Sequence, residues 1–335
     1  MSAAGELHVV FGSGPVGLSV IETLMAQGKQ VRVASRSGAR RSLPAAVEVV
    51  RGDATDPSDT RRVCAGASHV YNCTNAPDYH RWPEQFPPLQ RGVLAGAAGA
   101  GAKLVVMENL YMYGPHGGVP MTEATPLRGH GSRSTTRRLL TEELFAAHRA
   151  GQVRATSVRA SDLFGPHVTE SLVGDRFFGP FLAGKRVQLF ANPDVLHSMS
   201  FVGDVGRAMV MVGARDEALG RPWHAPNAPA VTLRAFVELV KEETGIAPPM
   251  SYVPRAVTRV MMPVLGLAVP PMRGLGENLY VFYESYVVDH SAYAAAFGGD
   301  ATPLREAIRQ TVAWARSRSD QATEAVGAAH ATTRS

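Results

Sequence analysis

Short hydrophobic runs alternate with amphipathic segments through the first half of the chain, and glycine or proline often separates them. This alternation is typical of a parallel sheet whose strands are joined by helices. The predicted strands are Leu7–Phe11, Gln30–Ala34, Val47–Arg51, His69–Asn72, Lys103–Glu108 and Arg154–Arg159. The predicted helices between them are Leu18–Gln27, Pro57–Ala65, Leu89–Gly99 and Arg133–Arg149.

The pattern changes beyond Asp162, where predicted helices are accompanied by only two short strands. The helices are Thr169–Ala183, Val202–Val212, Leu233–Glu243 and Pro303–Arg316, and the strands are Val187–Phe190 and Pro222–His224. We therefore expect an α/β fold, with a Rossmann-type doubly wound parallel sheet and a smaller, partly helical C-terminal substrate lobe. Residues 1–165 form the predicted dinucleotide-binding domain, whose sheet is completed by parts of the C-terminal half. Residues 166–316 form the lobe, and the small, polar segment 317–335 is expected to be a disordered tail.

A glycine-rich motif follows the first predicted strand directly and precedes a predicted helix. Gly12 permits a tight turn, Gly14 lets the backbone approach a pyrophosphate, and Gly17 allows close packing of helix on strand. Pro15 and Val16 then begin the helix, whose free N–H groups attract an anion. A glycine turn without a ligand is the alternative, but the strand and helix on either side favour dinucleotide binding.

The residues at the end of the second predicted strand indicate which of the two nicotinamide cofactors, NAD or NADP, is preferred. A site for NAD usually carries an acidic residue here, which binds the ribose hydroxyls. This chain instead has the segment Ala34-Ser35-Arg36-Ser37-Gly38-Ala39-Arg40-Arg41. Because a guanidinium group binds phosphate through several donors, we expect Ser35, Arg36 and Arg40 to favour NADP(H), with NAD(H) as the other candidate. A solvated loop of arginines is the alternative interpretation.

Composition narrows the classes of function. The 335 residues carry a net charge of +5, which is too modest to indicate a nucleic-acid-binding protein. Two cysteines cannot form a four-ligand zinc site, and no histidine pair has the spacing of metal ligands, so no metal is predicted. The absence of a signal-like N-terminus or a long apolar run predicts a cytoplasmic protein without membrane contact.

Further segments of the chain resemble the extended short-chain dehydrogenase/reductase family, also called the NAD-dependent epimerase/dehydratase family. The matching segments are Gly52–Asp56, Val70–Thr74, Tyr111–Pro115, Arg159–Pro166 and Ser200–Val205. The resemblance covers roughly residues 7–316. It implies that Asp53 and Ala54 lie near the adenine, and that Cys73 and Thr74 line the cofactor. It also implies a homodimer through the helices near Leu89–Gly99 and Arg133–Arg149.

The resemblance also shows where this chain departs from the family's catalytic Ser–Tyr–Lys triad. Counting from Gly114 puts Asn109 at the serine position, Ser134 at the tyrosine position and Arg138 at the lysine position. Serine is a far weaker acid than tyrosine, and arginine is always protonated, so neither replaces the family's proton relay. We expect Asn109 and Arg138 to orient ribose and substrate.

Tyr111 is the leading candidate for the missing proton donor, because it follows the fifth predicted strand at the nicotinamide end of the cofactor. A packing or substrate-stacking aromatic is the alternative of equal weight. Asp162 and His197 are candidate substrate contacts. The alternative for Asp162 is that it only caps the turn, and the alternative for His197 is a polar residue in a loop.

The sequence therefore predicts an NADP(H)-dependent oxidoreductase, in the direction of reduction, acting on a small organic carbonyl or activated alkene. One alternative is an epimerase or dehydratase, a lyase or isomerase with a retained cofactor. Another is a non-catalytic NADP(H)-binding sensor or scaffold, because such a protein would also lack the triad.

Overall fold

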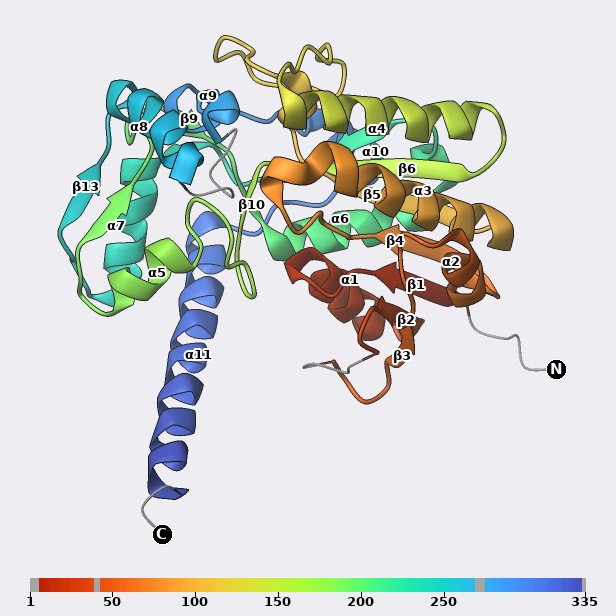
Figure 1. Ribbon diagram of the computed structural model, residues 1–335, viewed down its shortest axis with the longest axis horizontal. Coiled ribbons are helices and arrows are strands. Elements are labelled where there is room, and N and C mark those ends of the chain that lie inside the picture. Colours follow the sequence, from red (N-terminus) through yellow and green to blue (C-terminus); the bar gives the residue numbers. More distant parts are fainter. Residues whose placement is uncertain (1–5, 39–42, 269–274, 333–335) are drawn as a thin grey trace.

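A central parallel sheet organises the chain in the computed structural model, which describes residues 6–38, 43–268 and 275–332 (Figure 1). Its seven strands follow the order β11-β6-β5-β4-β1-β2-β3, and every neighbouring pair is parallel. The strands are β1 (Leu7–Phe11), β2 (Gln30–Ser35), β3 (Glu48–Arg51), β4 (Ala67–Asn72), β5 (Lys103–Glu108), β6 (Arg154–Arg159) and β11 (Pro222–His224). The predicted doubly wound sheet is confirmed, and its chain order reverses between β1 and β4. Ligands of such sheets bind at this crevice, beyond the carboxyl ends of the strands.

Helices cover both faces of the sheet. On one face lie α2 (Pro57–Cys64), α3 (Trp82–Ala100) and α4 (Ser132–Arg149), and on the other lie α1 (Pro15–Ala26) and α6 (Val202–Ala214). Val63, Val93 and Leu144 bury the first face, whereas Leu24 and Met209 bury the second. Burial on both faces explains why the strands appear in the sequence as continuous hydrophobic runs.

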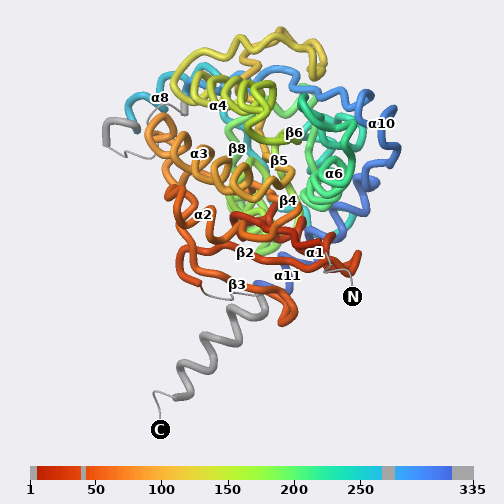
Figure 2. The backbone as a smooth tube through the Cα atoms, turned by 90° about the vertical axis from the view of Figure 1, so that its right-hand side faces the viewer, coloured from red at the N-terminus to blue at the C-terminus, as the bar shows by residue number. Residues whose placement is uncertain are grey.

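The C-terminal half adds a smaller lobe beside the sheet (Figures 1 and 2). Its core contains Phe177, Phe181, Phe236 and Ile308. Its helices are α5 (Asp175–Leu182), α7 (Leu233–Thr244), α8 (Arg255–Ala268), α9 (Tyr280–Tyr283) and α11 (Leu304–Thr332). Helix α10 (Ser291–Phe297) instead packs against β11 of the central sheet. Short strand pairs join β8 (Val187–Leu189) to β13 (Met250–Tyr252), β7 (Asp162–Phe164) to β10 (Met199–Phe201), and β9 (Leu196–His197) to β12 (Val231–Thr232). Single 3-10 turns are η1 (Tyr79–Arg81), η2 (Tyr111–Tyr113), η3 (Asp216–Ala218) and η5 (Leu275–Asn278).

Three predicted segments differ from the structure. The helix predicted over Thr169–Ala183 begins only at Asp175, because the chain folds back so tightly at Gly174 that a Cβ there would lie 2.2 Å from the carbonyl oxygen of Thr169. Helix α3 begins seven residues earlier than predicted, at Trp82, whose buried ring packs against Phe86. The expected disordered tail is wrong as far as Thr332, where α11 ends, because this segment is rich in alanine, the best helix former.

No helix within the described part of the chain is both long enough and apolar enough to cross a membrane.

Candidate functional site

The glycines of the turn between β1 and α1 differ in how closely protein atoms surround them. Gly12 has φ of +94°, and a Cβ on it would lie 2.7 Å from the carbonyl oxygen of Cys73. A Cβ on Gly17 would lie only 1.9 Å from the carbonyl oxygen of Gly12, so this helix turn packs directly against the loop. A Cβ on Gly14, in contrast, would meet no protein atom within 4 Å. The turn is therefore closed toward the protein and open at Gly14, which fits a pyrophosphate at the start of α1.

The N-terminus of α1 completes this cradle. Gly14 is the N-cap residue and Pro15 is the first helical residue, while the side chain of Val16 is buried beneath the turn. The free N–H groups of the first helical turn, together with the helix dipole, attract an anion.

The end of β2 lies directly beside this turn. Phe11 of β1 pairs with Ala34 of β2, so the chain leaves β2 at Ser35 next to the glycine loop. Ser35 lies 3.2 Å from Ser37, Oγ to Oγ, and Arg36 is exposed. Arg40 lies outside the described residues.

The other predicted cofactor contacts lie at the ends of β3 and β4. Asp53 accepts hydrogen bonds from the backbone and hydroxyl of Thr55, which fix the turn at Ala54. At the end of β4, the Cys73 N–H donates to the carbonyl oxygen of Phe11, and Thr74 donates to Asn72. Burial raises the pKa of the Cys73 thiol, so this cysteine stays protonated. All these turns lie at the carboxyl edge of the sheet.

Two adjacent arginines of α4, Arg137 and Arg138, have different surroundings on the nicotinamide side of the site. Arg137 lies beside Asn109, with its Nε 3.2 Å from the Asn109 Oδ1, and its guanidinium lies 4.6 Å from the Phe86 ring centre. Arg138 points away and pairs with Glu142 at 2.9 Å. Ser134 is buried and donates to Asn278 in the lobe at 3.4 Å. The structure therefore brings Asn109 together with Arg137, and does not bring Asn109 together with Arg138.

Tyr111 lies in an aromatic cluster beyond the end of β5. Its ring stacks on Trp82 with ring centres 5.9 Å apart, and Trp82 in turn lies 4.8 Å from Tyr79. Burial raises the pKa of Tyr111 well above its usual value, neighbouring Tyr79 and Asp162 raise it further, and the charge of Arg133 opposes them. Tyr111 is therefore a protonated hydroxyl at neutral pH.

Arg133 is the most unusual residue of this cluster. Its side chain is buried, with 2% of the residue exposed, and none of its three guanidinium nitrogens has a hydrogen-bond partner. The guanidinium carbon Cζ of Arg133 lies 5.8 Å from the centre of the Tyr79 ring, which is a cation–π contact. A buried guanidinium without partners is costly, so the arrangement calls for an anionic or hydrogen-bonding ligand.

Asp162 and His197 approach each other from β7 and β9. Asp162 Oδ2 lies 2.8 Å from His197 Nε2, an ion-pair distance, although the angle is not that of a hydrogen bond. The His197 ring stacks on Tyr286, with 5.4 Å between the ring centres. Asp162 acts electrostatically on Tyr79, Tyr111 and Tyr286, so both predicted substrate contacts lie near the aromatic cluster.

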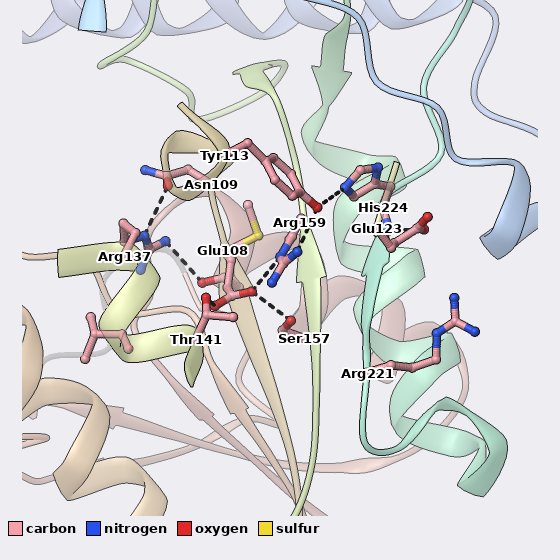
Figure 3. A network of polar contacts seen from close by, with 12 residues as sticks. Glu108, Asn109, Tyr113, Glu123, Arg137, Thr141, Ser157, Arg159, Arg221 and His224 are labelled. Atoms are coloured by element: carbon pink, nitrogen blue, oxygen red, sulfur yellow. Dashed lines mark hydrogen bonds and ion pairs between the residues drawn. The ribbon is translucent and has the colours of Figure 1, made fainter. Parts of the chain in front are cut away.

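A buried polar network supports the site from below (Figure 3). Glu108, the residue before Asn109, accepts hydrogen bonds from Thr141, Ser157 and Arg159. Arg159 also donates to the Tyr113 hydroxyl at 2.7 Å, and that hydroxyl lies 2.7 Å from His224 Nε2. Burial would raise the pKa of Glu108, but the charges of Arg159 and Arg137 lower it overall. Glu108 is thus an ionised anchor for the loop that carries Asn109 and Tyr111.

Sequence reasoning missed Arg133 and Arg137 as site residues. A signal was present, because these two arginines have the same four-residue spacing as the Ser134–Arg138 pair, one residue earlier. Residues four apart lie on one face of a helix, and the sequence does not say which of the two neighbouring faces is buried. The described residues contain no group of three or more His, Cys, Asp or Glu side chains arranged to hold a metal ion.

Comparison with known proteins identifies the family of this chain. The profile of the NAD dependent epimerase/dehydratase family matches residues 9–224. A curated relative, the 2'-dehydrokanamycin reductase of Streptomyces kanamyceticus, is 26% identical over 244 residues. That match covers 71% of this chain and 66%, just under two thirds, of the relative.

Solved structures share the fold at low sequence identity. The UDP-glucose 4-epimerase of Thermotoga maritima, solved with UDP-glucose, has a TM-score of 0.77 and 19% identity over 93% of this chain and 99% of its own. The dTDP-glucose 4,6-dehydratase of Bacillus anthracis, solved with NAD, has a TM-score of 0.75 and 15% identity over 93% and 97%. The family profile covers well over half of this chain and includes the glycine turn, β5 and α4. The chain therefore belongs to the NAD-dependent epimerase/dehydratase family of nicotinamide-dependent enzymes.

Proposed function

We propose that the chain is an NADP(H)-dependent reductase of a small organic carbonyl compound or activated alkene. The observation that carries this proposal is the end of β2, where Ser35 and exposed Arg36 follow the strand beside the glycine turn. An acidic residue at this place would repel a 2′-phosphate, and none stands between Ser35 and Gly38. A guanidinium attracts that phosphate instead.

The residues that would hold the cofactor follow from the turns at the carboxyl edge. Gly14 and the first turn of α1 would bind the pyrophosphate, Ser35 and Arg36 the 2′-phosphate, and Asp53 the adenine side. When bound, NADPH supplies the reducing equivalent to the substrate carbon.

Within the aromatic cluster, Tyr111 would donate the proton to the carbonyl oxygen of the substrate, because it lies just beyond the end of β5, where the nicotinamide end of the cofactor is expected. Burial makes this hydroxyl a weaker acid, and the positive charge of Arg133 offsets part of that effect. Arg137 and Asn109 would orient the nicotinamide ribose and the substrate, since they are held together at 3.2 Å. On this proposal Arg137 takes the ribose-orienting role predicted for Arg138, because Arg137 lies beside Asn109 and Arg138 pairs with Glu142.

The test is a fluorescence titration of the protein with NADPH and with NADH. We expect a preference of at least about tenfold, or about 1.4 kcal/mol, for NADPH. Arg36→Ala should remove most of the preference, whereas Arg149→Ala, an exposed arginine at the end of α4, should keep it. Equal binding of both cofactors would refute the NADP(H) proposal. Cofactor that stays bound through purification without net consumption would instead indicate the epimerase or dehydratase alternative.

The relative that reduces 2'-dehydrokanamycin supports the direction of reduction. In a screen of carbonyl compounds, NADPH consumption by the wild type and its loss in Tyr111→Phe would support the assigned donor. Binding of NADPH without turnover of any compound would favour the sensor alternative. We also propose that the protein is a homodimer through α3 and α4, which sedimentation would test.

A further inference from the structure

The inference concerns the charge of the substrate, and it rests on the proposed function. Buried polar atoms without a hydrogen-bond partner gather around the aromatic cluster. They include the three guanidinium nitrogens of Arg133, the Tyr286 hydroxyl and the indole N–H of Trp82. Since nearly all buried polar groups in proteins are satisfied, such a concentration marks a place where a ligand supplies the missing partners.

Arg133 sets the chemistry of that ligand. No described carboxylate lies within ion-pair distance of its guanidinium, whereas Arg159 is paired with Glu108, and Arg137 is bonded to Asn109 and lies near Glu108. Among the described acidic side chains near the cluster, Asp162 faces His197 and Glu277 accepts a hydrogen bond from the Ser132 N–H, and neither lies within ion-pair distance of the Arg133 guanidinium. Arg133 therefore carries a buried positive charge without a counter-ion among the described residues, and the missing partner is an anion.

The position of Arg133 distinguishes this anion from the cofactor phosphates. It lies at the start of α4 and approaches Tyr79 after β4, and its charge lowers the pKa values of Tyr79, Tyr111 and Tyr280. Tyr280 belongs to the C-terminal lobe, and Tyr111 is the assigned proton donor. The phosphate cradle, by contrast, is the Gly14 turn at the start of α1. Arg133 thus faces the substrate side of the site.

We propose that Arg133 binds a carboxylate of the substrate, so that the reductase acts on a carbonyl compound that also carries a carboxylate group. A guanidinium presents parallel N–H donors that match the two oxygens of a carboxylate. The guanidinium itself is buried beside the Tyr79 ring, and a charge-assisted hydrogen bond is stronger in such a place than in water. Tyr79, Tyr111 and Asp162 remain partly exposed, which leaves the cluster open to a small molecule from solvent.

Binding of unreactive probes tests the proposal without requiring turnover. Benzoate and benzamide have nearly the same shape and differ in charge, and calorimetry would measure both in the presence of NADPH and in its absence. We expect benzoate to bind at least tenfold more tightly than benzamide. Arg133→Met should abolish the difference and Arg133→Lys should restore part of it, whereas Arg149→Met should retain it in full.

The outcomes separate this inference from the proposed function. Equal binding of benzoate and benzamide by a folded, NADPH-selective wild type would overturn the carboxylate site and leave the reductase proposal intact. Arg133-dependent preference for benzoate without NADPH selectivity would support the anion site and refute the cofactor assignment. If Arg133→Met weakens NADPH binding and leaves the benzoate preference unchanged, Arg133 is a cofactor contact and the inference is wrong. Tighter binding of phenyl phosphate than of benzoate would also overturn it.

Discussion

Arg137 Nε lies 3.2 Å from Asn109 Oδ1 inside the protein, while the next residue, Arg138, pairs with Glu142 on the outside of the same helix. Successive residues on a helix are rotated by about 100°, so neighbouring arginines have entirely different surroundings. This relationship decides which arginine of α4 belongs to the candidate site.

The two arginines are expected to differ in their effect on activity. Arg137→Met should lower NADPH consumption at least about tenfold and destabilise the fold by about 1–2 kcal/mol, because it removes buried hydrogen bonds to Asn109 and Met107. Arg138→Met should change stability by less than about 0.5 kcal/mol, because it removes only an exposed ion pair. Steady-state kinetics and urea unfolding of both variants check this. A larger loss of activity in Arg138→Met than in Arg137→Met would instead support Arg138, which the count from Gly114 puts at the lysine position, as the site residue.

Two glycines of the cofactor turn should separate folding from binding. Gly17→Ala places a Cβ 1.9 Å from the Gly12 carbonyl oxygen, so we expect destabilisation of about 3 kcal/mol or more. Gly14→Ala meets no protein atom, and its cost is that of a weaker N-cap, about 1 kcal/mol. The Gly14 variant should nonetheless bind NADPH at least about tenfold more weakly, because the new methyl group stands where the pyrophosphate approaches. Thermal unfolding and NADPH titration measure the two effects. Unchanged NADPH affinity in Gly14→Ala would contradict the assigned phosphate cradle.

Glu108 is expected to be essential for stability rather than a reactant. Glu108→Gln removes the negative charge that faces Arg159 and Arg137 and leaves those charges buried, which costs about 3–5 kcal/mol. Ser157→Ala, which removes one neutral donor to the same carboxylate, should cost only about 1 kcal/mol. Urea unfolding at neutral pH compares the two. Equal costs would show that the carboxylate charge does not hold the network together.

Acid should weaken the fold through His8. Burial first, then the neighbouring His69, lowers the pKa of this β1 residue to about 4, from 6.5 in the unfolded chain. Between these values the unfolded chain binds more protons, so stability is present above pH 6.5 and falls as the pH drops toward 4. The loss attributable to His8 is about 3 kcal/mol at most. Unfolding free energies measured from pH 7 to pH 4 should fall less steeply in His8→Phe than in the wild type. An identical slope would assign the acid sensitivity to other groups.

The dinucleotide-binding half of the protein could be predicted from local sequence features. Two features of this half are local. Burial on both faces makes continuous hydrophobic runs of β1, β2, β4, β5 and β6. The spacing of Gly12, Gly14 and Gly17 is the second feature, because the turn between β1 and α1 requires glycine at positions 12 and 17 and is open at Gly14. The position of Asn109 and Tyr111 just after β5 could likewise be predicted from the sequence.

Which side chains of α4 lie beside Asn109 and Tyr111 depends on long-range packing and could not be predicted from local sequence. The helix could be predicted from sequence, but its rotation about its own axis depends on packing against Phe86 and Trp82 of α3, which begins seven residues earlier than predicted. That rotation turns Arg133 and Arg137 inward and Arg138 outward. The contact of Asp162 with His197 and the unpartnered state of Arg133 are likewise long-range results. Both depend on contacts between loops that are far apart in the chain, and such contacts cannot be predicted from a local sequence pattern.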